Sequence, residues 1–261
     1  MSIKEMVKEG KEVIRDWITR YHLLPKLLIV QVGNNEASNR YVRNKVKDCA
    51  EVGMIANVAK FDENIETVNL MEEIAARQKN YDGVIVQLPL PPHIDKESII
   101  FAIDENKDVD GFKKDSFFKP CTPLGIMLWL QYIDFEVKGK HVVIIGRSDI
   151  VGKPLAKLMT DEDATVTLCH SKTVDLDKFV KMADLIVCAV GKPHFLDCKD
   201  ITVPVIDVGI NFVDGKLVGD CYNGGDNVTP VPGGVGLLTR YALLMNVLSS
   251  HISEASLSDG L

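Results

Sequence analysis

The sequence has no long hydrophobic run and no excess of positive charge among its 261 residues. Its apolar stretches, of which LLIVQV and HVVIIG are the clearest, are far too short to cross a bilayer. The first 17 residues mix charged and apolar side chains and lack the apolar core of a signal peptide, which predicts a cytoplasmic protein with no membrane partner. The formal net charge of −7 argues against a nucleic-acid partner, because nucleic-acid binders usually carry a basic surface.

Motifs for metal and nucleophilic chemistry are also missing. The six histidines are scattered, with no His-Glu-x-x-His and no Cys/His cluster, so no metal is expected. No Gly-x-Ser-x-Gly sequence marks a hydrolase nucleophile. The six cysteines form no Cys-x-x-Cys pair and are expected to be reduced thiols in the core.

What the sequence does contain is an alternation of apolar runs with amphipathic stretches. In the first half, a helix at 2–20 precedes strands at 27–32, 55–60 and 83–87 and helices at 37–52, 66–79 and 96–102. In the second half, helices are predicted at 122–135, 152–159, 175–182 and 237–249, and strands at 141–146, 164–168, 184–190 and 203–209. Strands that alternate with helices predict an α/β fold with parallel sheets, and the restart near 120–140 predicts two domains.

Single residues mark where several of these helices begin and end. Ser2 and Thr122 are predicted N-caps, with Pro123 at the first helical position after Thr122. Gly53 is predicted to end the helix at 37–52.

The strand HVVIIG (141–146) runs directly into GRSDIVGKP and a predicted helix, an arrangement that binds a pyrophosphate at a helix N-terminus. The sequence is not the common Gly-x-Gly-x-x-Gly, since Gly146 is followed by Ser148 and then Gly152. NAD-binding folds usually place an acid after the next strand, to hold the ribose 2′-hydroxyl. Here that strand ends in CHSK (169–172) with no acid, and Arg147 adds positive charge. A 2′-phosphate suits this corner, so NADP is favoured over NAD.

Three further candidates follow predicted strands in the first half. They are Gly33-Asn34 with the helix behind it, Gln87-Leu88-Pro89, and the loop 108–111 (DVDG). Within that helix, Tyr41 and Lys45 stand four residues apart and share a face. Each feature also has a plain structural interpretation: a solvated basic helix face, a proline strand terminator and an Asp-Gly turn. The TPVPGGVG stretch (229–236) is either a close-approach loop against a ligand or a simple entry into the last helix.

These segments, in this order, resemble the bifunctional methylenetetrahydrofolate dehydrogenase/cyclohydrolase family. The resemblance covers nearly the whole chain and is carried by VGNNEASNRYVRNK (32–45), GVIVQLPLP (83–91), KDVDGF (107–112), PCTPLGI (120–126), VVIIGRSDIVGKP (142–154), TVTLCHSKT (165–173), ADLIVCAVGKP (183–193), VIDVGIN (205–211), GD (219–220) and TPVPGGVG (229–236). It departs from the family pattern after Gly236, where Leu237-Leu238 replaces the usual Pro-Met and Arg240 follows Thr239. The loops after Phe112 and Asp220 are also shorter than usual.

The resemblance implies a residue-by-residue assignment. Lys45 is the catalytic lysine, Tyr41 stacks on the folate, Gln87 tunes Lys45, and Asp110 binds the pterin ring. Val86, Leu88 and the loop of Pro232, Gly233 and Gly234 complete the substrate site. The residues expected to bind NADP are Gly146, Arg147, Ser148, Ser171 and Ile210.

The resemblance also implies the architecture and the reaction. Two α/β domains flank a cleft: a folate-binding catalytic domain of residues 1–120 plus 238–261, and a Rossmann-like NADP-binding domain of residues 121–237. A homodimer is expected. The enzyme oxidises 5,10-methylenetetrahydrofolate to the 5,10-methenyl form with NADP, then hydrolyses it to 10-formyltetrahydrofolate, a step that links it to purine biosynthesis.

Three other functions fit parts of the pattern. A short-chain dehydrogenase also uses Tyr-x-x-x-Lys, but there the pair follows the cofactor motif, whereas Lys45 precedes Gly146 by about a hundred residues. A monofunctional dehydrogenase of the same fold could do without the lysine. A folate- or nucleotide-binding protein that has lost catalysis would fit the shortened loops.

Overall fold

The computed structural model describes residues 1–258, including every side chain in that range except those of Ala37 and residues 254–258. The chain divides into two compact units, each treated on its own below. One unit, the second half unit, combines Met1–Lys8 with Thr122–Thr239. The other, the first half unit, combines Glu9–Cys121 with the chain from Arg240 onward. The sequence-based division instead grouped residues 1–8 with the first half, and it stays a prediction.

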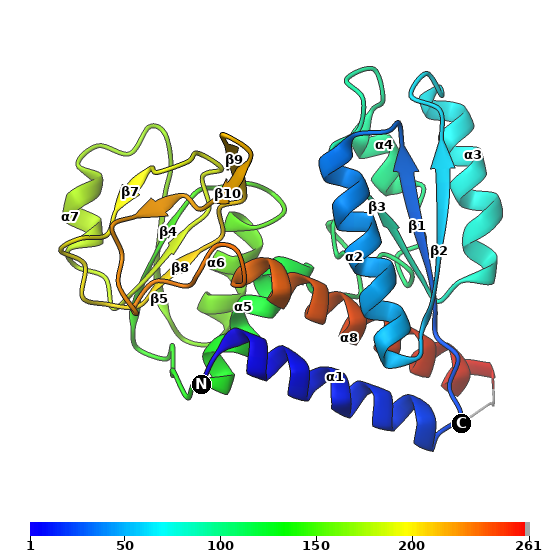
Figure 1. The fold of residues 1–261 in the computed structure, drawn as a ribbon, viewed down its shortest axis with the longest axis horizontal. Coiled ribbons are helices and arrows are strands. Elements are labelled where there is room, and N and C mark those ends of the chain that lie inside the picture. The colour runs from blue at the N-terminus through cyan, green and yellow to red at the C-terminus, as the bar shows by residue number, and fades with distance from the viewer. Residues whose placement is uncertain (259–261) are drawn as a thin grey trace. The chain divides into compact units, whose positions relative to one another are not determined.

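The first half unit is built on a three-stranded parallel sheet in the order β2-β1-β3 (Figure 1). Its strands are β1 (Lys26–Val32), β2 (Ile55–Phe61) and β3 (Gly83–Val86). Its helices are α2 (Glu36–Val52), α3 (Thr67–Arg77), the 3-10 turn η1 (Gln78–Asn80) and α4 (Lys96–Phe101). Helices α1 (Ile3–Arg20) and α8 (Val235–Ser258) contribute residues to both units.

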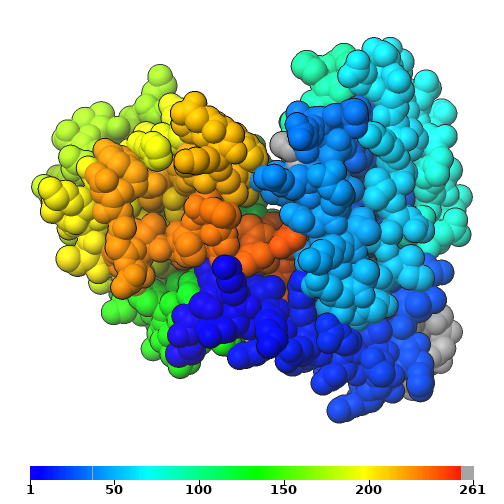
Figure 2. Space-filling view, viewed as in Figure 1, coloured from blue at the N-terminus to red at the C-terminus, as the bar shows by residue number. Residues whose placement is uncertain are grey.

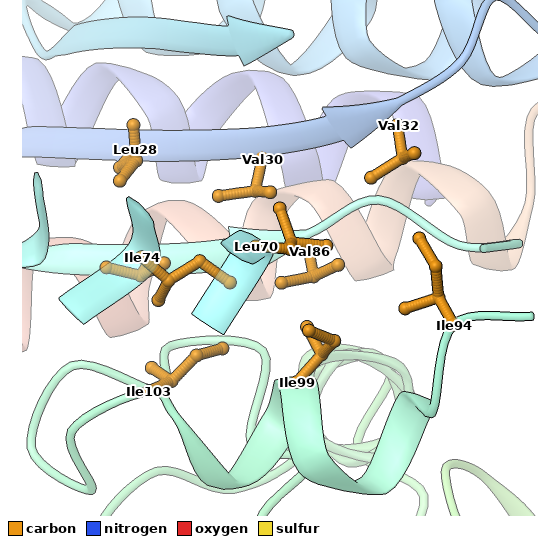
Figure 3. Packing of buried hydrophobic residues seen from close by; sticks show 10 residues of the cluster. Leu28, Val30, Val32, Leu70, Ile74, Val86, Ile94, Ile99 and Ile103 are labelled. Carbon is orange, nitrogen blue, oxygen red and sulfur yellow. The ribbon is translucent and has the colours of Figure 1, made fainter. Parts of the chain in front are cut away.

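Strand β1 is buried from Leu27 to Val32 because both of its faces are covered. Leu28, Val30 and Val32 point toward a cluster that includes Leu70 and Ile74 of α3 and Ile99 of α4 (Figure 3). Alternation puts Gln31 on the opposite face, where its side-chain amide donates to Asn39 of α2 at 2.7 Å. Helix α2 therefore covers the face opposite α3 and α4.

The second half unit contains a four-stranded parallel sheet in the order β5-β4-β6-β8. Its strands are β4 (His141–Ile145), β5 (Thr165–Cys169), β6 (Leu185–Cys188) and β8 (Val205–Asp207). Its helices are α5 (Cys121–Tyr132), α6 (Gly152–Asp161) and α7 (Leu176–Val180). Two small two-stranded sheets pair β7 (Leu196–Asp197) with β11 (Cys221–Tyr222) and β9 (Asn211–Val213) with β10 (Lys216–Val218).

Most predicted elements are confirmed, and two of the predicted helix ends are too. Ser2 caps α1, since its hydroxyl accepts from the Glu5 N–H at 3.3 Å and the Glu5 carboxylate accepts from Ser2 N–H at 2.7 Å. Gly53 ends α2 in the left-handed conformation at φ 90°.

Three local predictions were wrong. Thr122 is not an N-cap, because α5 already begins at Cys121, whose N–H donates to the Asp110 carbonyl at 3.2 Å. Strand β8 stops at Asp207 rather than at 209. The Asp207 carboxylate accepts from the Gly209 N–H, and the chain turns there. The last helix runs to Ser258, well beyond the predicted 249.

The outer face of α1 is open to solvent and is seen in dark blue in Figure 2. Val13 and Trp17 are exposed along it, and so is Tyr21 just after the helix ends. Among the described residues, no helix is both long enough and apolar enough to span a membrane.

Candidate active site

Lys45 and Gln87 meet across the face of the first half unit that α2 covers. Gln87 follows Val86, the last residue of β3, and its backbone N–H donates to the Val30 carbonyl at 2.8 Å, which continues the sheet. Its side-chain Nε2 donates to the Leu88 carbonyl at 2.7 Å, so Oε1 is the atom turned toward the helix. Lys45 Nζ donates to that oxygen at 3.3 Å. The amide thus holds the amine without adding charge beside it.

Tyr41 lies one turn before Lys45 on α2, on the same face. Its side chain is half-buried, and this burial raises the pKa of the phenol while the Arg40 guanidinium opposes the rise. Tyr41 therefore stays neutral near pH 7 and presents an aromatic ring beside the amine. Asn35 starts the helix by accepting from the Ser38 N–H at 3.0 Å, which sets the register of both residues.

The Asp110 loop joins this unit through tight backbone packing. Asp108 extends the sheet by a bridge to Val84, and Gly111 follows at φ +70°. A Cβ at Gly111 would lie 2.6 Å from the Pro120 nitrogen, so only glycine fits there. Asp110 itself is buried, 7% exposed. The backbone of the loop that carries Asp110 is therefore closely packed.

Helix α8 is hydrogen-bonded to the segment that carries Asp110. The buried Asn246 side chain donates to the carbonyls of Val109 at 2.9 Å and Lys119 at 3.1 Å. Cys121 donates its thiol to the Val109 carbonyl at 3.2 Å. Sequence reasoning missed this clamp, because Asn246 is one of several polar residues in α8 and nothing local marks it out.

Burial dominates the electrostatics around Asp110. It raises the pKa of Asp108, and the nearby Asp110 charge raises it further, against a hydrogen bond from the Lys113 N–H at 2.7 Å. The pKa of the Cys121 thiol lies well above its ordinary value, first because of burial and then because of the Asp110 carboxylate. Lys45 acts on the same thiol in the opposite direction. Lys45, Asp110 and Cys121 therefore share one electrostatic environment.

In the second half unit, the turn from β4 to α6 contains two glycines, Gly146 and Gly152, that have no room for a side chain. Gly146 has φ +124°, and a Cβ there would lie 2.1 Å from the Ala189 carbonyl oxygen. A Cβ at Gly152 would lie 2.0 Å from the Gly146 carbonyl oxygen. The Ser148 hydroxyl accepts from the N–H groups of Val151 at 3.2 Å and Gly152 at 3.4 Å. This strand–glycine turn–helix cradle fits a dinucleotide phosphate at the N-terminus of the ten-residue α6.

The carboxyl ends of neighbouring strands converge beside this turn. Gly146 N–H donates to the Cys169 carbonyl at 2.9 Å, which places the segment carrying Arg147 next to the segment carrying Ser171. Arg147, Ser148 and Ser171 are all exposed. Ile210 follows β8 and is also exposed, and its Cδ1 lies within 3.8 Å of where a Cβ on Gly236 would stand. The predicted cofactor residues therefore gather on strand ends of one sheet.

The predicted glycine loop lies in the same unit. Gly233 adopts φ +102°, and a Cβ on Gly234 would lie 2.3 Å from the Pro230 carbonyl oxygen, so both glycines are required by the backbone. Pro232 is exposed. The predicted substrate residues are thus divided between the units. The first half unit contains Tyr41, Lys45, Val86, Gln87, Leu88 and Asp110, and the second half unit contains Pro232, Gly233 and Gly234.

Two buried carboxylates that sequence reasoning overlooked shape the cofactor side. Asp220, fully buried, accepts from the N–H groups of Val190 at 2.7 Å, Gly191 at 2.9 Å and Lys192 at 2.9 Å. Asp207 accepts from the N–H of Asp220 at 2.9 Å, and burial raises its pKa. The segments VIDVGIN (205–211) and GD (219–220) carry these two acids, but no role was predicted for either. These acids fix the loop that follows β6.

The fold and these two sites define an α/β enzyme with a dinucleotide-binding unit and a lysine-bearing unit. Family models match both parts: the tetrahydrofolate dehydrogenase/cyclohydrolase catalytic domain at residues 1–110, and the NAD(P)-binding domain of the same family at residues 120–255. The chain belongs to the tetrahydrofolate dehydrogenase/cyclohydrolase family, as its sequence predicted. It is a dehydrogenase and cyclohydrolase of tetrahydrofolate derivatives, and the two-domain α/β fold class is confirmed.

Individual relatives are similar over almost their full length. Bifunctional protein FolD of Hydrogenobaculum sp. (strain Y04AAS1) is 41% identical over 270 residues, covering 95% of this chain and 96% of that one. The crystal structure of the bifunctional FolD methylenetetrahydrofolate dehydrogenase/cyclohydrolase of Campylobacter jejuni has a TM-score of 0.89 and 38% identity, covering 97% and 96%. The Trypanosoma brucei enzyme, solved with NADP cofactor and an inhibitor, has a TM-score of 0.86 and 33% identity, covering 97% and 95%.

Proposed function

We propose that this enzyme oxidises 5,10-methylenetetrahydrofolate with NADP and hydrolyses the methenyl product, with Lys45 transferring the proton in the second step. The observation that carries this proposal is the hydrogen bond from the Lys45 amine to the Gln87 amide oxygen at 3.3 Å. This hydrogen bond holds the Lys45 amine about one helical turn from the Tyr41 ring. The family has both dehydrogenase and cyclohydrolase activity. Such a pair suits a flat pterin that must be held while a proton moves.

On the substrate side, each residue has a defined task. The half-buried Tyr41 ring stacks on the pterin, and the Asp110 carboxylate accepts hydrogen bonds from pterin N–H groups. Val86, Gln87 and Leu88 line the position at the end of β3. Pro232, Gly233 and Gly234 offer a backbone without bulky side chains, against which a ring can lie closely.

On the cofactor side, the cradle after β4 receives the pyrophosphate, and Arg147 with Ser148 and Ser171 recognises the 2′-phosphate. The exposed Arg147 guanidinium suits a phosphate because its fork can donate two parallel hydrogen bonds. Ile210 supplies an apolar contact. NADP held by these residues would supply the acceptor for a hydride from the methylene carbon. The protein's contribution to that step is to bind and orient the two reactants.

In the hydrolytic step, water attacks the methenyl carbon, and Lys45 takes a proton from that water molecule. A carbon–oxygen bond forms, the bond from that carbon to N5 breaks, and N5 receives a proton. The formyl group stays on N10, and one proton is released overall because the methenyl substrate is a cation. Gln87 keeps the amine within reach of the water during these transfers. A general acid–base group of this kind contributes about 10²–10⁴-fold.

The test is a spectrophotometric assay that follows NADPH and methenyl-folate together, with NADP and NAD in parallel. Appearance and then decay of methenyl-folate is expected, with NADP strongly preferred. A methenyl product that decays only at the spontaneous rate indicates a monofunctional dehydrogenase. Binding without turnover indicates a folate-binding protein that has lost catalysis. Either result contradicts the proposal.

The assembly and cellular role are proposed on separate grounds. Residues 1–120 with 238–261 form the folate domain and residues 121–237 the NADP domain. Strand β2 is an edge strand with exposed Ile55 and Val58, which supports a homodimer through that edge. The six free cysteines support a reducing cytoplasm, and 10-formyltetrahydrofolate supplies purine biosynthesis. Light scattering of the wild type and of Val58→Glu tests the dimer.

A further inference from the structure

A buried ion cluster lies one turn along α2 from Lys45. Lys11 of α1 places its Nζ 2.5 Å from Asp48 Oδ1 and 2.7 Å from Glu51 Oε2. Arg240 of α8 places its Nη1 3.0 Å from Asp48 Oδ2. The side chains of Lys11, Asp48 and Arg240 are only 14%, 6% and 20% exposed. Asp48 is therefore a buried carboxylate held between two cations from different helices.

The position of Asp48 on α2 makes it a competitor for Lys45. Residues 41, 45 and 48 follow the i, i+4, i+7 spacing that puts side chains on one helix face. A lysine and an aspartate three residues apart on a helix are neighbours and can form an ion pair. In the structure, Lys45 instead donates to Gln87 Oε1 at 3.3 Å. Another cation must therefore pair with the Asp48 carboxylate.

Arg240 is the group that engages the second oxygen of Asp48. Within residues 1–258, no hydrogen bond of regular geometry reaches the buried Oδ2, so the Arg240 guanidinium is the counter-ion identified there. A buried carboxylate deprived of a counter-ion is strongly disfavoured. The pKa of the Cys49 thiol also indicates that these charged groups lie close together. Burial and the Asp48 charge raise this pKa to about 12, whereas Lys45 and Lys11 act in the opposite direction.

We propose that Arg240 is a positioning residue that prevents Asp48 from capturing the Lys45 amine. With Arg240 in place, Asp48 is paired and Lys45 stays on Gln87. Without it, Asp48 Oδ2 turns to the Lys45 amine on its own helix face, and an ion-paired ammonium cannot take a proton from water. This inference rests on the proposed role of Lys45 and extends it to a cluster on three helices.

The experiment compares four variants of the full-length enzyme: Arg240→Met, Arg240→Lys, the double variant Arg240→Met with Asp48→Asn, and Lys45→Met. In Arg240→Met, cyclohydrolase kcat is expected to fall by about tenfold or more while dehydrogenase kcat stays within about threefold. The double variant removes the competing charge and is expected to recover cyclohydrolase kcat to within about threefold of wild type. Arg240→Lys keeps the charge and is expected to do the same. Arg77→Met breaks an exposed pair with Glu73 and serves as the matched control, with both activities unchanged.

The two activities and the second-site variant separate positioning from plain destabilisation. Equal losses of both activities in Arg240→Met, in step with a lowered thermal midpoint, would mean a structural role and would overturn the proposal. No recovery in the double variant would overturn it as well. If Arg240→Met does not fold, the double variant and Arg240→Lys still decide the question, because both are required to retain cyclohydrolase kcat. Cyclohydrolase activity that survives in Lys45→Met refutes the proposed function itself, whatever Arg240 does.

Discussion

Replacing Asn246 by alanine tests whether α8 fixes the Asp110 loop for substrate binding. Asn246 Nδ2 donates to two carbonyls of that loop, Val109 at 2.9 Å and Lys119 at 3.1 Å. The Val109 carbonyl keeps a second partner in the Cys121 thiol, whereas the variant leaves the Lys119 carbonyl without its Asn246 partner. Two lost hydrogen bonds at about 0.5–1.5 kcal/mol each, plus about 1–2 kcal/mol for a poorly satisfied, partly buried carbonyl, give about 2–5 kcal/mol of lost unfolding free energy.

The functional consequence is confined to the folate side. Because the loop carries Asp110, two KM values are expected to rise about tenfold: that for methylenetetrahydrofolate in the dehydrogenase reaction and that for methenyltetrahydrofolate in the cyclohydrolase reaction. The KM for NADP is expected to stay within about twofold, because the cofactor cradle after β4 belongs to the other unit. Urea unfolding measures the stability change, and steady-state kinetics with each substrate varied in turn measure the two KM values.

Ser250→Ala supplies the matched control one turn further along α8. The buried Ser250 hydroxyl bonds to the carbonyls of Asp82 at 2.6 Å and Asn106 at 3.1 Å, so it holds the same unit but not the Asp110 loop. It is expected to cost about 1–2 kcal/mol with no change in either KM. A rise in folate KM as large in Ser250→Ala as in Asn246→Ala would refute the clamp, as would an Asn246→Ala variant with unaltered KM.

Four further outcomes follow from the same geometry. Lys45→Met should reduce cyclohydrolase activity by about 10²–10⁴-fold and dehydrogenase activity much less, measured as methenyl-folate decay at neutral pH corrected for spontaneous hydrolysis. Arg147→Ala should weaken the binding of NADP by about 1.5–3 kcal/mol, and an equal loss of NAD binding would contradict the assignment of Arg147 to the 2′-phosphate. Gly146→Ala should abolish NADP binding, measured by fluorescence titration, since a Cβ would stand 2.1 Å from a carbonyl oxygen; normal titration would contradict the cradle. Cys49, buried and with its pKa raised to about 12, should resist iodoacetamide at pH 8 until the protein is unfolded, with peptide mass spectrometry as the readout.

Local patterns were enough to predict the succession of strands and helices. The apolar run of β1 is continuous because both faces of the strand are covered, and the helix periods around it are equally local properties. Gly53 and Ser2 were identified for the same reason: a cap is formed by residues within one turn of the helix end.

Local patterns failed where a distant group replaced a local one. The start of α5 is set by the Asp110 carbonyl rather than by Thr122, so the cap that the sequence indicated is not used. Helix α8 continues past 249 because Ser250 and His251 bond to Asp82, far away in the chain. No periodicity within either helix carries that information.

The two α/β units, the glycine turn after β4 and the Tyr41–Lys45 spacing can be predicted from the sequence, because each depends on residues close together in the chain. Which polar groups face one another depends instead on long-range packing. Gln87 meets Lys45 from 42 positions away, Asn246 reaches Val109 across 137, and Arg240 of α8 pairs with Asp48 of α2. A buried polar group must find a partner or remain costly, and the packing of helices on sheets determines which partner lies within reach.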